Sequence, residues 1–127
     1  MGFDITDLAD ESRVVFVNFW NWRPTVEILR TANLLDDKRL AGLHQQISAT
    51  RISRNEARAI AHYLREHVLP NLSHDARVLL AGATTTQPDD GVFHRSAEDF
   101  NQNYSATRSW LETFADFCES CGGFEFN

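Results

Sequence analysis

Two cysteines near the C-terminal end have a spacing that redox and metal sites both use, Cys118-x-x-Cys121. A redox pair needs a stabilised thiolate, which is usually found at a helix N-terminus or beside cations. Here the pair falls near the end of a helical pattern, where the helix dipole disfavours anions, and Glu119 lies between the two thiols. The sequence therefore disfavours redox catalysis by these cysteines.

Zinc binding is the stronger functional interpretation of Cys118 and Cys121, because Cys-x-x-Cys-Gly resembles a zinc knuckle. A structural zinc ion normally has four protein ligands, and the sequence contains no second Cys-x-x-Cys. Two of five histidines would have to join the pair: His44, His62, His67, His74 and His94. We expect instead two reduced cysteines that pack as small hydrophobic residues, with no cofactor, and keep zinc as the alternative.

A second candidate is the segment WNWRP, residues 20–24. Proline suits the first position of a helix and pushes the residue before it toward extended geometry. The sequence therefore predicts a strand-to-helix corner at Trp22–Pro24, with Arg23 beside the unpaired N–H groups of the helix start. Such a corner could hold a carboxylate or a phosphate. The structural alternative is an internal ion pair of Arg23 and core packing of Trp20 and Trp22.

The segment 83–103 contains no long periodic element. A loop of this length in a compact domain is usually functional or disordered. His94 shares it with four acids, which are Asp89, Asp90, Glu98 and Asp99. Together these side chains could bind a metal or carry out acid–base catalysis, but their spacing matches no EF-hand. A solvated acidic loop is the favoured interpretation.

These two segments define the ligand site that the sequence predicts. The corner supplies aromatic surface and a guanidinium, and the loop is long enough to act as a lid. The predicted ligand-binding residues are Trp20, Trp22, Arg23 and His94. The segments are far apart in the sequence, so the site requires that the fold bring them together.

Arginines recur along one helical pattern, with Arg54, Arg58 and Arg65 in a stripe and Arg51 near it. Such a stripe could contact an anion or a nucleic acid. More often such a stripe pairs with carboxylates of the same protein or is simply solvated, and this is what we expect here.

The hydrophobic periodicity predicts the elements that position these residues. Strands at 2–6 and 13–19 form an N-terminal hairpin, and both faces of the second strand are apolar, which predicts cover on both sides. Ser53 and Glu56 form a capping box that opens the clearest helix. The expected helices are 24–34, a short one from Asp36 or Asp37, 53–70, a short one after Ser73, and one from Ser105 to Cys121. A connecting loop at 44–52 and a short strand at 124–126 complete the pattern.

The fold class that follows is α+β, a mostly helical single domain over residues 1–127 with a small hairpin and a short C-terminal strand. A chain of 127 residues is long enough for one core and too short for two ordinary domains. The core is expected to contain Ile28, Leu29, Ile60, Leu64, Trp110, Phe114 and Phe117.

Composition excludes several classes of function. The net charge of −6 disfavours nucleic-acid binding, because phosphate contacts need clustered Lys and Arg, and it would suit a basic protein partner. No apolar run approaches the ~20 residues that span a bilayer, so no membrane partner is expected. The acidic N-terminal residues are unlike a signal peptide, which favours a cytoplasmic location.

The segments WNWRP and FCESCGGFEF, with Gly2-Phe3-Asp4 at the start, resemble a family of small uncharacterised bacterial proteins. Its members share a Gly-Phe-Asp start, a Trp-Arg-Pro helix opening and a Phe-Cys-x-x-[Ser/Cys]-Gly-Gly-Phe ending. The resemblance covers about a third of the chain. It implies a bacterial source and a single domain, and it supplies no activity.

The favoured function is a non-catalytic binding or interaction protein, with another protein as partner and no assigned catalytic residue. An immunity-like or phage-related accessory protein that presents its acidic surface to a basic partner fits this interpretation. The two alternatives are a zinc-binding module using Cys118 and Cys121, and a small enzyme using His94 and the carboxylates of 83–103. The sequence contains no phosphate-binding glycine loop, no Gly-x-Ser-x-Gly and no His-Glu-x-x-His. It does not indicate an oligomeric state.

Overall fold

The computed structural model describes residues 2–45, 50–88 and 92–126. Within them the helices are α1 (Phe19–Ala32), α2 (Asp37–Gln45), α3 (Arg54–Tyr63) and α4 (Arg108–Ser120). The strands are β1 (Gly2–Asp7), β2 (Asp10–Asn18), β3 (Arg51–Ser53), β4 (Arg77–Leu79), β5 (Thr84–Thr85), β6 (Ser105–Thr107) and β7 (Gly123–Phe126). A π-helical turn (Leu64–Val68) and two 3-10 turns (Leu69–Asn71 and Phe100–Asn103) lie between them.

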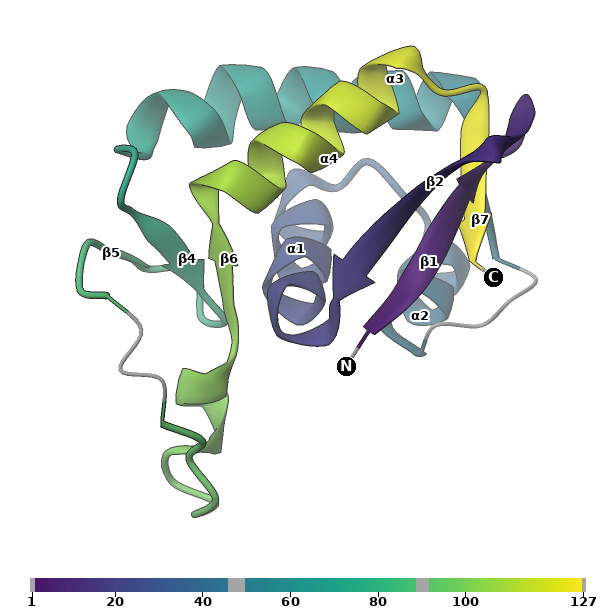
Figure 1. The fold of residues 1–127 in the computed structure, drawn as a ribbon. Helices are drawn as coiled ribbons and strands as arrows, with labels where there is room; N and C mark the ends of the chain where they lie inside the picture. Colours follow the sequence, from purple (N-terminus) through teal and green to yellow (C-terminus); the bar gives the residue numbers. More distant parts are fainter. Residues whose placement is uncertain (1, 46–49, 89–91, 127) are drawn as a thin grey trace.

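The strands form two separate antiparallel sheets. The larger has the order β2-β1-β7-β3, so the C-terminal strand lies between the N-terminal hairpin and β3. The smaller has the order β5-β4-β6. Figure 1 shows α3 and α4 side by side across the top, with the larger sheet to the right, the smaller sheet to the left and α1 between them.

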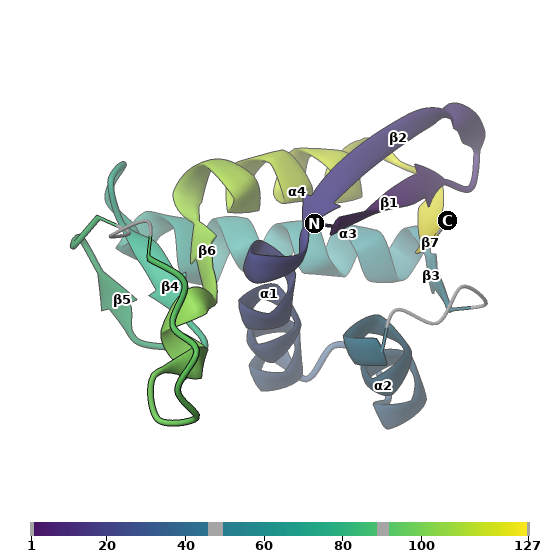
Figure 2. The ribbon, with the colours of Figure 1, turned by 60° about the horizontal axis from the view of Figure 1, so that its bottom comes forward.

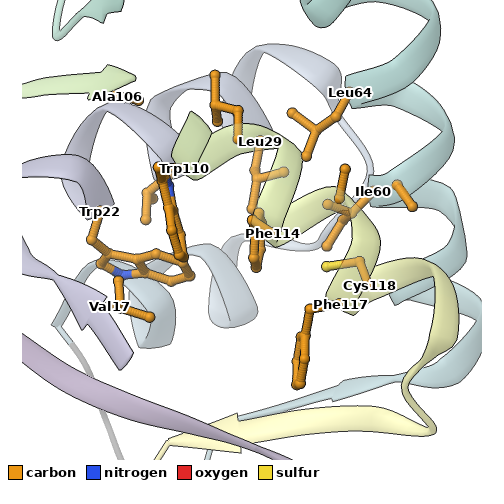
Figure 3. Packing of buried hydrophobic residues seen from close by; sticks show 14 of the residues in the cluster. Val17, Trp22, Leu29, Ile60, Leu64, Ala106, Trp110, Phe114, Phe117 and Cys118 are labelled. Carbon is orange, nitrogen blue, oxygen red and sulfur yellow. The ribbon is translucent and has the colours of Figure 1, made fainter. Parts of the chain in front are cut away.

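The core lies where α1, α3 and α4 meet the larger sheet, and Figure 3 shows its packing. Trp22 and Phe114 are fully buried, and their rings meet edge to face with centroids 5.6 Å apart. Six of the seven predicted core residues are buried. The seventh, Ile28, is half-buried and packs against the cluster.

The α+β class is confirmed, with more strand than a mostly helical fold implies. The predicted hairpin, the capping box of Ser53 and Glu56 and the C-terminal strand are all present. The predicted loop 44–52 is wrong at its ends, since α2 continues to Gln45 and β3 starts at Arg51, while residues 46–49 lie outside the described part. Gly42 lies inside α2, where an added side chain would collide with that of Thr50.

The predicted corner at Trp22–Pro24 is wrong, because α1 begins five residues earlier. The side chain of Asn18 accepts a hydrogen bond from the N–H of Trp20 (2.8 Å) and caps the helix there. Pro24 therefore lies inside α1, where it has no N–H to donate to the carbonyl of Trp20. The unpaired N–H groups of the helix start are consequently not beside Arg23.

One further helix prediction failed and another began too early, both where short strands compete. The segment after Ser73 forms β4, because Val78 pairs with Ala106 of β6 and with Thr84 of β5. Since β6 includes Ser105, α4 is capped two residues later, by Thr107, which accepts from the N–H of Trp110 (3.1 Å). Isolated sequence patterns do not reveal pairing between such short, distant strands.

Candidate functional site

The loop 83–103 does reach the start of α1, and the two meet through aromatic side chains. The ring of Trp20 lies 5.6 Å from Phe93, 6.4 Å from Phe100 and 5.0 Å from Tyr104, measured between centroids. Phe19 completes the group, 5.6 Å from Trp20. We call these five residues the aromatic corner. It is partly open to solvent, since Phe93 is 49% exposed.

Polar contacts within the loop hold the aromatic corner in place. The side-chain amide of Asn103 accepts from the backbone N–H of His94 and donates to its carbonyl, both at 2.8 Å. Asp99 accepts hydrogen bonds from Ser96 and Gln102 at the next turn. Asp99 is thereby engaged in holding the turn.

Arg23 lies next to the aromatic corner, three residues after Trp20 and so on the same side of α1. Its Nη1 donates to the hydroxyl of Tyr104 (3.2 Å), and its guanidinium carbon lies 4.9 Å from the centre of that ring. Its Nη2 lies 3.3 Å from Nε2 of His44, at the end of α2. Of the predicted site residues, Trp20 therefore contacts the loop, and Arg23 contacts Tyr104, which directly follows the loop.

Trp22 does not belong to this group. Two residues on a helix are about 200° apart, so Trp22 points away from Trp20 and into the core. It is fully buried and donates from Nε1 to the carbonyl of Leu43 (2.9 Å). In an extended segment the two tryptophans would share a side, and the early start of α1 separates them.

His94 faces a different space, a cavity of about 750 Å³ between the loop and the smaller sheet. Its polar lining includes Arg77, Thr85, Gln87, Asn101 and Gln102. No Asp or Glu is among the described residues of this lining, and Asp89 and Asp90 lie outside the described part of the chain. Asp99 is hydrogen-bonded to Ser96 and Gln102, and neither Asp99 nor Glu98 lines this cavity.

Cys118 and Cys121 are buried free thiols, and Figure 3 shows Cys118 among core side chains of α3 and α4. Burial raises the pKa of Cys118 well above its ordinary value of 9.0 and raises that of Cys121 as well. This is the environment of inert structural cysteines. In residues 2–45, 50–88 and 92–126, no three His, Cys, Asp or Glu side chains gather as a metal would require.

Three of the four arginines of the predicted stripe contact groups of the same molecule, whereas Arg54 is exposed. Arg58 donates from Nη1 to the carbonyls of Cys118 and Cys121, both at 2.8 Å, and so caps the end of α4. Arg65 pairs with Asp116 and Glu119 on the same helix. Arg51 pairs with Glu125 across the sheet, at 2.9 Å.

The outer face of β2 carries apolar side chains that nothing covers among the described residues. Val14 is 44% exposed and Phe16 is 61% exposed. The prediction that both faces of this strand are covered is therefore wrong. Val17 is fully buried on the inner face, and Val15 packs against the core from the same side.

Phe16 has a defined place on this outer face. It lies opposite Asp4 of β1, and Val14 lies opposite Thr6. Its ring lies over Gly2, where a Cβ would come within 2.7 Å of the ring atom Cζ. The absence of a side chain at Gly2 thus makes room for the ring against the sheet.

β2 is also an edge of the larger sheet. It pairs with β1 along Asp10–Asn18, and no described strand pairs with its other side. Figure 2 shows β2 along the upper margin of the sheet with no strand beyond it. We call Val14, Phe16 and the unpaired side of β2 the β2 edge. Sequence analysis missed it because alternation alone cannot tell which apolar face of a strand is covered.

The charges around the β2 edge are acidic. Asp4, Asp10 and Glu11 form no ion pair within the described residues, whereas Asp7 pairs with Arg13. Hydrogen bonds from the side chain and backbone of Ser12 lower the pKa of Asp10, so its carboxylate stays ionised. The surface next to the exposed apolar side chains is therefore negative.

None of the helices in the described residues is both long and apolar enough to cross a bilayer. Comparisons with models of protein families, with curated proteins and with solved structures found no match. The function of the protein is therefore inferred from the geometry described above.

Proposed function

We propose that this protein is a non-catalytic interaction module that binds an extended, basic segment of another protein along the β2 edge. The observation that carries the proposal is the 61% exposure of Phe16 on an unpaired edge strand. Proteins recognise extended segments by adding them to such an edge, where backbone hydrogen bonds give affinity and side-chain contacts give specificity.

Residues 14–18 of the β2 edge lack the features that usually prevent such pairing. Natural edge strands are commonly protected by lysine, proline, bulges or very short length. This segment pairs regularly with β1 and contains no charge and no proline. Nearer the turn the register shifts from Thr6 opposite Val14 to Asp7 opposite Asp10, so a bulge in β2 limits the unprotected edge to this segment. An unprotected apolar edge is stable in a soluble protein when a partner covers it.

Charge determines which partner fits. Asp4, Asp10 and Glu11 flank the β2 edge without ion pairs among the described residues, and the whole chain carries −6. A strand that alternates Lys or Arg with apolar residues would place its cations near these carboxylates. A second copy of this chain would bring two acidic surfaces together, so a basic partner is favoured over self-association.

The remaining sequence expectations are part of this proposal. The family resemblance supports a bacterial source, and an immunity-like or phage-related accessory role in the cytoplasm agrees with an acidic protein that binds a basic one. A zinc module would need ligands beyond Cys118 and Cys121, and an enzyme would need a carboxylate beside His94. No cluster of three metal-ligating side chains occurs in the described residues, whereas the β2 edge lies entirely within them.

The test is a selection of random twelve-residue peptides on the folded wild-type protein, followed by measurement of their binding to the double variant Val14→Lys, Phe16→Ser. The proposal predicts enriched peptides that alternate basic and apolar residues, with at least tenfold weaker binding to the double variant. The matched control is Val92→Ser, which removes an equally exposed apolar side chain (59%) outside the sheet and should leave binding unchanged. Peptides that bind the double variant equally well would refute the proposal.

A further inference from the structure

Arg23 is the most unusual charged residue of the molecule. Six other arginines form ion pairs with carboxylates: Arg13, Arg30, Arg39, Arg51, Arg65 and Arg108. Arg23 is half-buried, and no carboxylate of the described residues pairs with it. Its Nε is, among the described residues, the one buried side-chain nitrogen or oxygen without a hydrogen-bond partner. Such an arrangement costs stability unless a ligand completes it.

The groups that hold Arg23 in the described residues include no carboxylate, and they leave one edge of the guanidinium incomplete. Nη1 donates to the hydroxyl of Tyr104, and the ring of Tyr104 covers one face. Nε–H and Nη2 form the edge that binds carboxylates with two parallel hydrogen bonds. On that edge Nη2 meets only Nε2 of His44, at 3.3 Å, and Nε meets nothing.

The aromatic corner lies beside Arg23. Trp20 is three residues from Arg23 on the same side of α1, and both contact Tyr104. Trp20 and Phe93 are partly exposed, so an apolar group bound there would replace water on their rings. A cation and an aromatic surface together suit a ligand that has an acidic end and an apolar body.

We propose that Arg23 binds the carboxylate of a small molecule whose apolar or aromatic body packs against Trp20 and Phe93. The carboxylate accepts from Nε and Nη2 together, and the side chain of His44 moves aside from Nη2. The hydroxyl of Tyr104 still accepts from Nη1, and its ring still covers the face of the guanidinium, so the orientation of Arg23 is retained. His44 is a positioning residue that holds Nη2 while the site is empty.

A carboxylate fits this site better than a phosphate. No lysine or second arginine contacts Arg23 in the described residues, so one positive charge is available. The two negative charges of a phosphate would face this single positive charge in a protein whose net charge is already −6. One planar guanidinium edge also matches one planar carboxylate in geometry. This proposal does not depend on the β2 edge.

The test is titration with phenylacetate, followed by nitrogen–proton NMR of the tryptophan side chains and of Arg23 Nε. Phenylacetate should shift the signals of Trp20 and Arg23 and leave that of Trp22, which is buried in the core. 2-Phenylethanol, which lacks the charge, should bind at least tenfold more weakly, and phenyl phosphate should bind no better than phenylacetate.

Three variants separate a specific site from general attraction. Arg23→Gln should weaken phenylacetate binding at least tenfold, while Arg30→Gln, at an exposed position on the same helix, should have less than a twofold effect. His44→Ala removes the group that competes for Nη2 and should strengthen binding two- to fivefold. Equal binding to wild type and Arg23→Gln, or no shift of the Trp20 signal at millimolar phenylacetate, would overturn the proposal. Unchanged core tryptophan signals in each variant establish that it remains folded.

Discussion

At the scale of single residues, two kinds of exception indicate function: a buried polar group without a partner and an exposed apolar group on an ordered element. The Nε atom of Arg23 is of the first kind and Phe16 is of the second. The meeting of Trp20 with the loop was predicted from residue types and loop length. The partners of Arg23, which are Tyr104 and His44, were not predicted, because these contacts join distant segments.

Phe114 should be among the residues on which stability depends most. It is fully buried between Trp22, Trp110 and Phe124, and replacing a buried phenylalanine by alanine costs about 3–5 kcal/mol. Phe93→Ala is the matched control, because its half-exposed ring should cost less than about 1 kcal/mol. Urea unfolding of both variants measures the difference, and similar losses would contradict the described core.

The cysteines should make stability depend on pH in the alkaline range. Burial raises the pKa of the Cys118 thiol well above 9.0, so the folded protein keeps a proton that the unfolded chain releases. Stability is therefore fully present below about pH 8.5 and falls as the pH rises through the ordinary thiol range. As the pH rises from 7 to 10, the urea concentration at the midpoint of unfolding should fall less for Cys118→Ala than for wild type.

Thiol labelling provides the second measurement on this pair. At pH 8 an alkylating reagent should react with Cys118 only after denaturant is added, since the folded state holds few thiolates. Rapid alkylation of the native protein at Cys118 would show that the thiol is accessible and ionised, contrary to the structure.

At the scale of elements, the sequence predicted what local chemistry determines and missed what distant pairing determines. The capping box at Ser53 places both its bonds within four residues, so the start of α3 was predictable. Pro24 led to a wrong prediction of where α1 begins. Proline marks a helix start only when no better cap precedes it, and Asn18 is such a cap. β4 and β6 are each only three residues long, and each depends on its pairing with the other.

One arginine should determine the stability of the α3–α4 pair. Arg58 donates two charge-assisted hydrogen bonds to the last carbonyls of α4, so Arg58→Ala should cost about 2 kcal/mol. Arg54, one turn earlier on α3, is exposed, and Arg54→Ala should change stability by less than about 0.5 kcal/mol. Thermal unfolding compares the two, and equal effects would show that Arg58 does not cap α4.

At the scale of the whole molecule, the larger sheet is covered on its inner face and open at one edge. The composition predicted an acidic protein whose partner is basic. The structure shows that acidic residues without an ion pair among the described residues lie on the same sheet as Phe16. The covered and open faces of β2 could not be distinguished from the sequence, because Val14, Val15, Phe16 and Val17 are all apolar. Only the position of the helices shows which face is buried.

The central claim is that a partner strand pairs with the β2 edge, and backbone hydrogen exchange tests it most directly. In the free protein about half of the β2 amides point away from β1 and should exchange rapidly with solvent. With a saturating basic peptide from the selection, these alternate amides should become at least tenfold more protected, and higher salt should reverse the effect. Unchanged exchange along β2 in the saturated complex would contradict the claim.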